Sequence, residues 1–354
     1  MADWPMFHRD PERSGYTTEE VVSPDTLRWV LQTEDAVFFA SPTVSGNRCY
    51  CGSRDGYLYS VEADKGKFLW SYRTADEGNL ANSAADSQVF AGSSRDGCLR
   101  AISADSGDLI WVFQTLGPVF SSPLEVEDTV VIGSSDGNLY ALDRKTGSKL
   151  WEFRCGGEMR YSSCLAGRAV CVGSTNGVLY AVDLEAGRPL WNFRTQGAVN
   201  CTPAAGEGLV LCGSDDQHLY ALEAGSGHLT WKYRTDGQLR STCAVAPGRV
   251  ILTSLDGRCY ALEAESGRQV WHYRTNDAIH SSPAVAATTV VFGSGDGYLY
   301  GLEFDSGRLL WRNQIGSQVI SSPAVAGGRI YVGAENGRLY CYGGSARARS
   351  RKKK

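Results

Sequence analysis

The chain has 354 residues, of which 42% are hydrophobic, 10% aromatic and 21% charged, with a formal net charge of −4. This apolar content excludes disordered and collagen-like classes, and no apolar run reaches the roughly 20 residues that span a bilayer. Because the opening residues MADWPMFHRDPERSG carry charges where a secretory signal needs apolar residues, we expect a cytoplasmic protein without a membrane span. We expect its 11 cysteines to be reduced and mostly buried.

Tryptophan recurs at nearly constant spacing along the whole chain. After Trp4 the intervals are 41, 41 and then 40 residues five times. The series is Trp29, Trp70, Trp111, Trp151, Trp191, Trp231, Trp271 and Trp311. This regularity indicates a repeat architecture, which explains how so long a chain can form one domain. We expect each tryptophan of the series to pack between neighbouring repeats as a structural residue.

Strand signals follow one another in a fixed order within each period. Residues 1–25 form a lead-in segment, and the strand-like segment LRWVLQT around Trp29 comes next. A representative period, residues 121–151, contains SSP, TVVIGS and NLYALD before its tryptophan strand. Alternating β-branched and aromatic residues predict strands, and no window shows a sustained helical period. Each complete period therefore predicts four strands.

Two turn positions recur between these strands. Asp-Gly or Asn-Gly separates the second and third strands in seven periods, as in Asp136-Gly137, and favours the positive φ angles of a tight hairpin. The fifth period has Asp216-Gln217 instead, so we expect a looser or differently twisted turn there. A glycine four residues before each tryptophan from Trp70 onward predicts a second positive-φ turn.

Eight such units predict an all-β, eight-bladed β-propeller of four-stranded blades over residues 26–343. The last unit ends in GRLYCYGG without a tryptophan strand of its own. The N-terminal strand around Trp29 is therefore predicted to complete the last blade and close the ring, which removes exposed sheet edges. Residues 344–354 form a basic tail that we expect to be disordered.

The third repeat carries a family resemblance. The segment ALDRKTGSKLW, Ala141 to Trp151, resembles the tryptophan-docking motif of the pyrroloquinoline-quinone (PQQ) repeat, and the likeness extends over about residues 26–343. The opening WPMFHRDPERSGY also resembles the lead-in of stand-alone PQQ-like repeat proteins of prokaryotes. Three branches are relevant: quinoprotein alcohol dehydrogenases, BamB-type scaffolds, and the propeller of aminoadipate-semialdehyde dehydrogenase-type proteins, which has no assigned chemistry.

The sequence departs from the first two branches. The dehydrogenases hold PQQ and Ca²⁺ beneath a vicinal disulfide, whereas no two cysteines are adjacent here and long insertions between blades are missing. BamB is lipid-anchored, whereas the first cysteine is Cys49. The resemblance therefore implies the fold, and fold alone does not supply a reaction. We expect no cofactor, and a quinoprotein-type dehydrogenase that uses PQQ with Ca²⁺ is the alternative.

No catalytic or metal site emerges from the residue pattern. The five histidines are scattered without metal-ligand spacing: His8, His218, His228, His272 and His280. Cys49 and Cys51 share one face of a strand, but two thiols are too few for structural zinc. Phosphate-binding glycine loops that open a helix are missing as well. We therefore predict no catalytic residue and no metal.

A candidate site comes from positions that vary while their neighbours repeat. The residue nine after each tryptophan should stand at the start of an inner strand, near one end of the channel. Arg160, Asn200, Arg240 and His280 are predicted on one arc of that mouth. Phe120 and Ile320 are predicted on the other, together with Phe39, which aligns after a shift of one residue, and with Asn79 or Leu80 in an altered loop of the second blade. The hypothesis is a site with donors for an anion facing an apolar surface; alternatively these side chains reach solvent or pair with nearby acids.

Charge is divided unevenly along the chain. The tail ARARSRKKK holds six basic residues, which leaves 29 basic against 39 acidic residues, or −10, in the remainder. Such a tail can contact anionic surfaces but predicts no specific nucleic acid. We predict a monomeric, non-catalytic binding or scaffolding propeller that recognises protein segments on one face. A sensor of a small anionic metabolite at the channel mouth is a further alternative.

Overall fold

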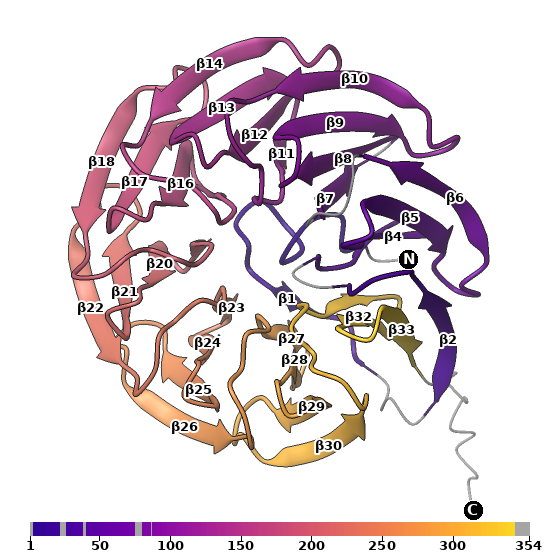
Figure 1. The fold of residues 1–354 in the computed structure, drawn as a ribbon. Helices are drawn as coiled ribbons and strands as arrows, with labels where there is room; N and C mark the ends of the chain where they lie inside the picture. The colour runs from indigo at the N-terminus through magenta and orange to yellow at the C-terminus, as the bar shows by residue number, and fades with distance from the viewer. Residues whose placement is uncertain (1–2, 22–25, 38–39, 75–79, 86, 344–354) are drawn as a thin grey trace, which may run out of the picture.

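The computed structural model describes residues 3–21, 26–37, 40–74, 80–85 and 87–343. Eight β-sheets stand in a ring about a central axis, as Figure 1 shows. No helix is assigned to the described residues, and none of them belongs to a helix able to cross a membrane. The predicted all-β, eight-bladed propeller is therefore confirmed.

The blades are numbered in chain order, each from its inner to its outer strand. Blade 1 holds β3 (Thr43–Ser45), β4 (Arg48–Gly52), β5 (Tyr57–Glu62) and β6 (Phe68–Arg73), and blade 2 holds β7 (Leu80–Ala85), β8 (Gln88–Ser93), β9 (Cys98–Ser103) and β10 (Leu109–Gln114). Blade 3 holds β11 (Leu124–Val126), β12 (Thr129–Gly133), β13 (Asn138–Asp143) and β14 (Lys149–Arg154), and blade 4 holds β15 (Cys164–Ala166), β16 (Ala169–Gly173), β17 (Val178–Asp183) and β18 (Pro189–Arg194). Blade 5 holds β19 (Ala204–Gly206), β20 (Leu209–Gly213), β21 (His218–Glu223) and β22 (Leu229–Arg234), and blade 6 holds β23 (Ala244–Ala246), β24 (Arg249–Thr253), β25 (Arg258–Glu263) and β26 (Gln269–Arg274). Blade 7 holds β27 (Ala284–Ala286), β28 (Thr289–Gly293), β29 (Tyr298–Glu303) and β30 (Leu309–Gln314), and blade 8 holds β31 (Ala324–Ala326), β32 (Arg329–Ala334), β33 (Arg338–Tyr342) and β2 (Leu27–Gln32).

The two ends of the chain meet in blade 8. Strand β2 pairs antiparallel with β33, and Trp29 lies opposite Cys341. The N-terminal strand thus closes the ring as predicted. Blade 7 differs from the prediction of four strands, because β1 (Tyr16–Thr17) of the lead-in pairs in parallel with β27 as a fifth strand.

The tryptophan series joins neighbouring blades. The indole of Trp231 in blade 5 donates a hydrogen bond of 2.9 Å to the carbonyl of Ala264 in blade 6, and its ring lies against Gly267. The same indole bond recurs at 2.7–3.1 Å for Trp29, Trp70, Trp111, Trp151, Trp191 and Trp271. Trp311 packs against the buried cluster that joins blades 7, 8 and 1. The recurring glycine before each tryptophan therefore also provides the flat surface that receives the indole of the preceding blade.

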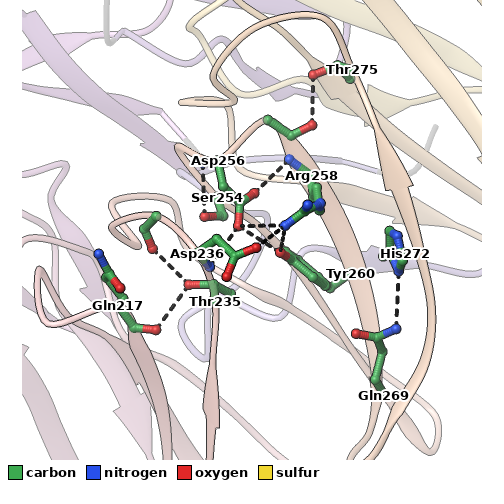
Figure 2. A network of polar contacts seen from close by, with 12 residues as sticks. Gln217, Thr235, Asp236, Ser254, Asp256, Arg258, Tyr260, Gln269, His272 and Thr275 are labelled. Carbon is green, nitrogen blue, oxygen red and sulfur yellow. Dashed lines mark hydrogen bonds and ion pairs between the residues drawn. The ribbon is translucent and has the colours of Figure 1, made fainter.

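The aspartate of the Asp-Gly turn makes a second link between blades. Figure 2 shows the example in blade 6, where Asp256 accepts hydrogen bonds from the Tyr260 hydroxyl at 2.7 Å and from the backbone N–H of Asp236 at 3.1 Å. Asp236 belongs to the loop that follows the outer strand of blade 5, and Arg258 bonds to its carboxylate. The two aspartate contacts recur together at Asp55, Asp136, Asp216 and Asp296.

The turn of blade 5 does not differ in the way the sequence predicted. The backbone N–H of Ser214 donates to the carbonyl of His218, and the N–H of Gln217 donates to the carbonyl of Ser214, each at 3.1 Å. The matching groups of the blade 6 turn form the same two bonds at the same distance. Gln217 adopts φ of 71°, close to the 79° of Gly257 in blade 6. The prediction of a looser turn was wrong, because the surrounding blade holds a glutamine in the left-handed conformation that glycine takes elsewhere.

Apolar side chains form separate clusters between adjacent blades, as where Ile251 and Leu302 share one cluster across blades 6 and 7. All 11 cysteines are buried and unpaired, which agrees with the prediction of buried thiols. Burial raises the pKa of several thiols, including Cys155 and Cys201, to about 12. They are therefore packing residues rather than nucleophiles.

Candidate binding site at the mouth of the channel

The lead-in segment occupies the interior of the ring. Its backbone exchanges hydrogen bonds with the inner strand of blade 1 through Trp4 and Val44, at 2.8 Å in both directions. Further carbonyls of the segment accept the N–H groups of Ala84, Leu165, Ala205, Val245 and Val285, in blades 2, 4, 5, 6 and 7. In Figure 1 the indigo lead-in crosses the middle of the propeller before it reaches β1. These partners belong to the inner strands of six blades, so the lead-in lies inside the ring.

Two buried polar side chains anchor the lead-in. Arg13 has no exposed surface, and its guanidinium donates to the carbonyls of Ser163 at 3.0 Å, Pro123 at 3.1 Å and Phe7 at 2.6 Å. Burial lowers the pKa of Arg13 to about 10, which keeps it charged at neutral pH. The ring nitrogens of His8 lie 2.7 and 2.8 Å from the carbonyl oxygens of Arg13 and Pro283. Arg13 thus ties the segment to blades 3 and 4, and His8 ties it to blade 7.

A pocket of about 290 Å³ lies where the inner strands begin, with Phe7 of the lead-in among its lining residues. We call it the mouth pocket. Five of the predicted site residues line it: Phe120, Arg160, Arg240, His280 and Ile320. Leu80, one of the two options for blade 2, also lines it, as do Ala81 and Tyr161. Phe39 and Asn79 lie outside the described residues. The structure therefore brings together most of the predicted set.

Asn200 is the exception among the described candidates. Its side-chain amide donates to Asp215 at 2.7 Å, and Asn200 is not part of the pocket lining. Asp215 also accepts from Arg240 Nε at 3.1 Å. Asn200 thus positions the carboxylate that orients Arg240. The alternative prediction, pairing with a nearby acid, describes Asn200 best.

A ring of hydroxyl groups completes the pocket, and the sequence analysis did not single it out. Ser41, Ser122, Ser162, Thr202, Thr242, Ser282 and Ser322 line the pocket, one from every blade except blade 2. Hydroxyl oxygens of this ring accept the backbone N–H of the matching residue in the preceding blade, as Thr202 does from Ser162 at 3.0 Å. The recurring SSP motif was the signal for this ring, because its second residue points into the pocket from blade after blade.

The electrostatics of the pocket are set by its arginines. Arg160 Nε donates to Glu158 at 2.7 Å, and both Arg160 and Arg240 retain partial solvent exposure. Burial, and next the positive charge of Arg240, lower the pKa of His280, while Asp277 acts in the opposite direction. His280 is therefore neutral at pH 7. No carboxylate belongs to the described lining, so the pocket presents donors and apolar surface.

The lining does not fit the PQQ and Ca²⁺ pair of quinoprotein dehydrogenases. Calcium takes six to eight oxygen ligands and draws on carboxylates, whereas the lining offers hydroxyls and arginines. The described residues also contain no group of three or more histidine, cysteine or acidic side chains placed to hold a metal ion. The vicinal disulfide that covers PQQ has no counterpart either, since no two cysteines are adjacent.

The fold and the repeat define the class: this is a PQQ-like eight-bladed propeller, as the resemblance implied. A family model described as outer membrane protein assembly factor BamB matches residues 20–192. A second model, described as the β-propeller of the beta-alanine-activating enzyme, matches residues 124–353, more than half of the chain. The chain belongs to this beta-alanine-activating enzyme β-propeller family.

Solved structures share the fold at low sequence identity. BamB from Moraxella catarrhalis is 19% identical with a TM-score of 0.78, and the match covers 90% of this chain and 99% of BamB. Quinohemoprotein alcohol dehydrogenase from Comamonas testosteroni is 15% identical with a TM-score of 0.85, covering 98% of this chain and 81% of the dehydrogenase. The computationally designed protein Ika8 is 18% identical with a TM-score of 0.80, covering 88% and 97%. No curated protein matches the sequence. An assembly factor and a dehydrogenase thus share this architecture.

Proposed function

We propose that this chain is a non-catalytic binding propeller that recognises protein segments at the face carrying the mouth pocket. The observation that carries the proposal is the asymmetry of the channel. The lead-in fills its interior through backbone bonds to six blades, and a pocket remains at the mouth. A rigid ring with one recessed, donor-rich site suits recognition of an inserted chain.

Two further observations support a binding role. In the described lining no hydroxyl is hydrogen-bonded to His280 or to a carboxylate, so none has a neighbouring base that would activate it as a nucleophile. The likeness to BamB, whose family description is an assembly factor, favours protein recognition. The family name suggests that the partner is connected with an enzyme that activates beta-alanine. The 11 unpaired thiols favour the reducing cytoplasm.

Peptide selection tests the proposal. Random peptides displayed on phage, as internal and as C-terminal fusions, are selected on the immobilised propeller. We expect enriched peptides that lose binding to the Arg160→Ala, Arg240→Ala double variant and keep binding to Arg268→Ala. Arg268 is a matched control, because it is an exposed arginine that pairs with Glu263 in the β25–β26 turn, outside the pocket lining. Failure to enrich any peptide, or equal binding to both variants, would contradict the proposal.

A further inference from the structure

We propose that the mouth pocket binds an organic carboxylate, with the anionic head at Arg160 and Arg240 and an apolar body against Phe120 and Ile320. The proposal deepens the function proposed above and rests on it for the idea that the pocket receives a ligand. It names the chemistry of that ligand. The carboxylate can belong to a free small acid or to the C-terminus of a protein chain.

The first argument concerns the two guanidinium groups. Each is held from one side by a carboxylate outside the pocket lining, Arg160 by Glu158 at 2.7 Å and Arg240 by Asp215 at 3.1 Å. These contacts use Nε of Arg160, and Nε and Nη2 of Arg240. Within the described part of the chain, both Nη atoms of Arg160 and Nη1 of Arg240 thus have no protein acceptor. They are oriented donors at the edge of the pocket, the arrangement that recognises an oxyanion.

The hydroxyl ring adds further donors to the pocket lining. The oxygens of Ser162, Thr202, Ser282, Ser322 and Ser41 each accept a backbone N–H from a neighbouring blade, at 2.8–3.2 Å. A hydroxyl that already accepts a hydrogen bond still has its own O–H to donate. The polar part of the pocket therefore consists largely of donors. A ligand that offers acceptor oxygens satisfies them, whereas an ammonium group does not.

The charge balance selects a singly charged head. Arg160 with Glu158, and Arg240 with Asp215, form two ion pairs whose formal charges cancel, and His280 is neutral at pH 7. The pocket thus offers many hydrogen bonds and little net positive charge. A carboxylate suits this balance better than a doubly charged phosphate, whose desolvation needs more compensating charge.

The opposite side of the pocket selects an apolar body. Phe120 exposes 36% of its surface although it is a large aromatic residue, and Ile320, Leu80 and Phe7 line the same pocket. A volume of about 290 Å³ lies just below the usual range for ligand pockets, about 300–1,000 Å³. The ligand is therefore compact: an aromatic or branched aliphatic acid, or the last side chain and carboxylate of a polypeptide.

Calorimetric titration of the full chain with a small panel tests the inference. The panel contains benzoate, its neutral analogue benzamide, phenyl phosphate, and a tetrapeptide ending in phenylalanine with a free or an amidated C-terminus. We expect benzoate or the free-ended peptide to bind, and benzamide and the amidated peptide to bind at least about tenfold more weakly, because they lose charge-assisted hydrogen bonds. Preference for benzoate identifies a free acid as the source, and preference for the peptide identifies a chain end.

Variants connect the binding to the pocket. Arg160→Gln with Arg240→Gln should weaken carboxylate binding at least about tenfold, and the Arg268→Gln control should leave it unchanged. The C2 proton of His280 gives an independent readout by NMR, since a bound anion raises the pKa of that imidazole. No binding up to about 10 mM, equal binding of benzamide, tighter binding of phenyl phosphate, or insensitivity to the double substitution would each overturn the inference. If displayed internal peptides still require the arginines while every carboxylate fails, the inference is wrong and the proposed function stands.

Discussion

Replacement of Gly267 by alanine tests how the tryptophan series holds the blades together. Gly267 has φ of +68°, and a Cβ atom there would lie 2.5 Å from Cε3 of Trp231 in the preceding blade. Gly248 of the same blade has φ of +70° and no heavy atom within 4 Å of its Cβ position. The two glycines therefore have nearly the same positive φ, and only Gly267 contacts the indole.

The expected free energies follow from this difference. An alanine in the left-handed region costs about 1–2 kcal/mol, and both substitutions pay this cost. Only Gly267→Ala also pushes a methyl group into a packed indole, which costs about 1–3 kcal/mol more. Gly248→Ala should thus destabilise the protein by about 1–2 kcal/mol and Gly267→Ala by about 2–5 kcal/mol.

Urea unfolding followed by circular dichroism measures both variants under the same conditions. A third comparison uses Trp231→Ala, which by itself should cost about 3–5 kcal/mol because a nearly buried indole and its hydrogen bond to Ala264 are lost. In that background Gly267→Ala should cost no more than Gly248→Ala. If Gly267→Ala is no worse than Gly248→Ala in the native sequence, or if its extra cost survives the loss of Trp231, the docking argument is refuted.

Three other outcomes are expected. Tyr260→Phe should destabilise the protein by about 1 kcal/mol in urea unfolding, because Asp256 loses the hydroxyl donor at 2.7 Å, and an unchanged midpoint would show that this clamp contributes nothing. The pKa of His280 lies below its ordinary 6.5, so at acidic pH the unfolded chain binds a proton that the folded chain does not, and stability should fall as pH drops below 6.5. His280→Gln should reduce the loss of stability between about pH 7 and about pH 5. An unchanged pH profile would show that other groups cause this loss of stability. PQQ with Ca²⁺ should leave the thermal unfolding midpoint unchanged, whereas a calcium-dependent rise of several degrees would favour the quinoprotein alternative.

The architecture could be predicted because its signals repeat. Each tryptophan marks an outer strand, and each Asp-Gly pair marks a tight turn between two strands. One such mark is weak evidence for a blade, but its recurrence at constant spacing is strong evidence for a propeller. The contacts between blades could not be predicted in this way. The indole of Trp231 meets Gly267, and the carboxylate of Asp256 meets the N–H of Asp236, through the curvature of the ring rather than through any local pattern.

The site was predictable in part for the same reason. A fixed offset from the tryptophans located Arg160, Arg240 and His280 at the pocket. The offset could not show that Asn200 bonds to Asp215 instead of lining the pocket, because this hydrogen bond depends on a side chain of the adjacent turn. The lead-in occurs once in the chain, so the repeat pattern could not predict that Arg13 is buried among carbonyls of two blades.

The position of the lead-in has a consequence for how the protein is made. Residues 4–17 leave the ribosome before their partners, which extend to Ala287, and β2 has to wait for β33, which lies more than 300 residues later. The lead-in therefore cannot complete its final contacts until blade 7 has been synthesised, and β2 cannot pair until β33 has been synthesised. Such long sequence separation slows folding. Until then β1 and β2 lack their partner strands β27 and β33 and remain available to a chaperone or to a second nascent chain, and truncated products should be the most prone to aggregate.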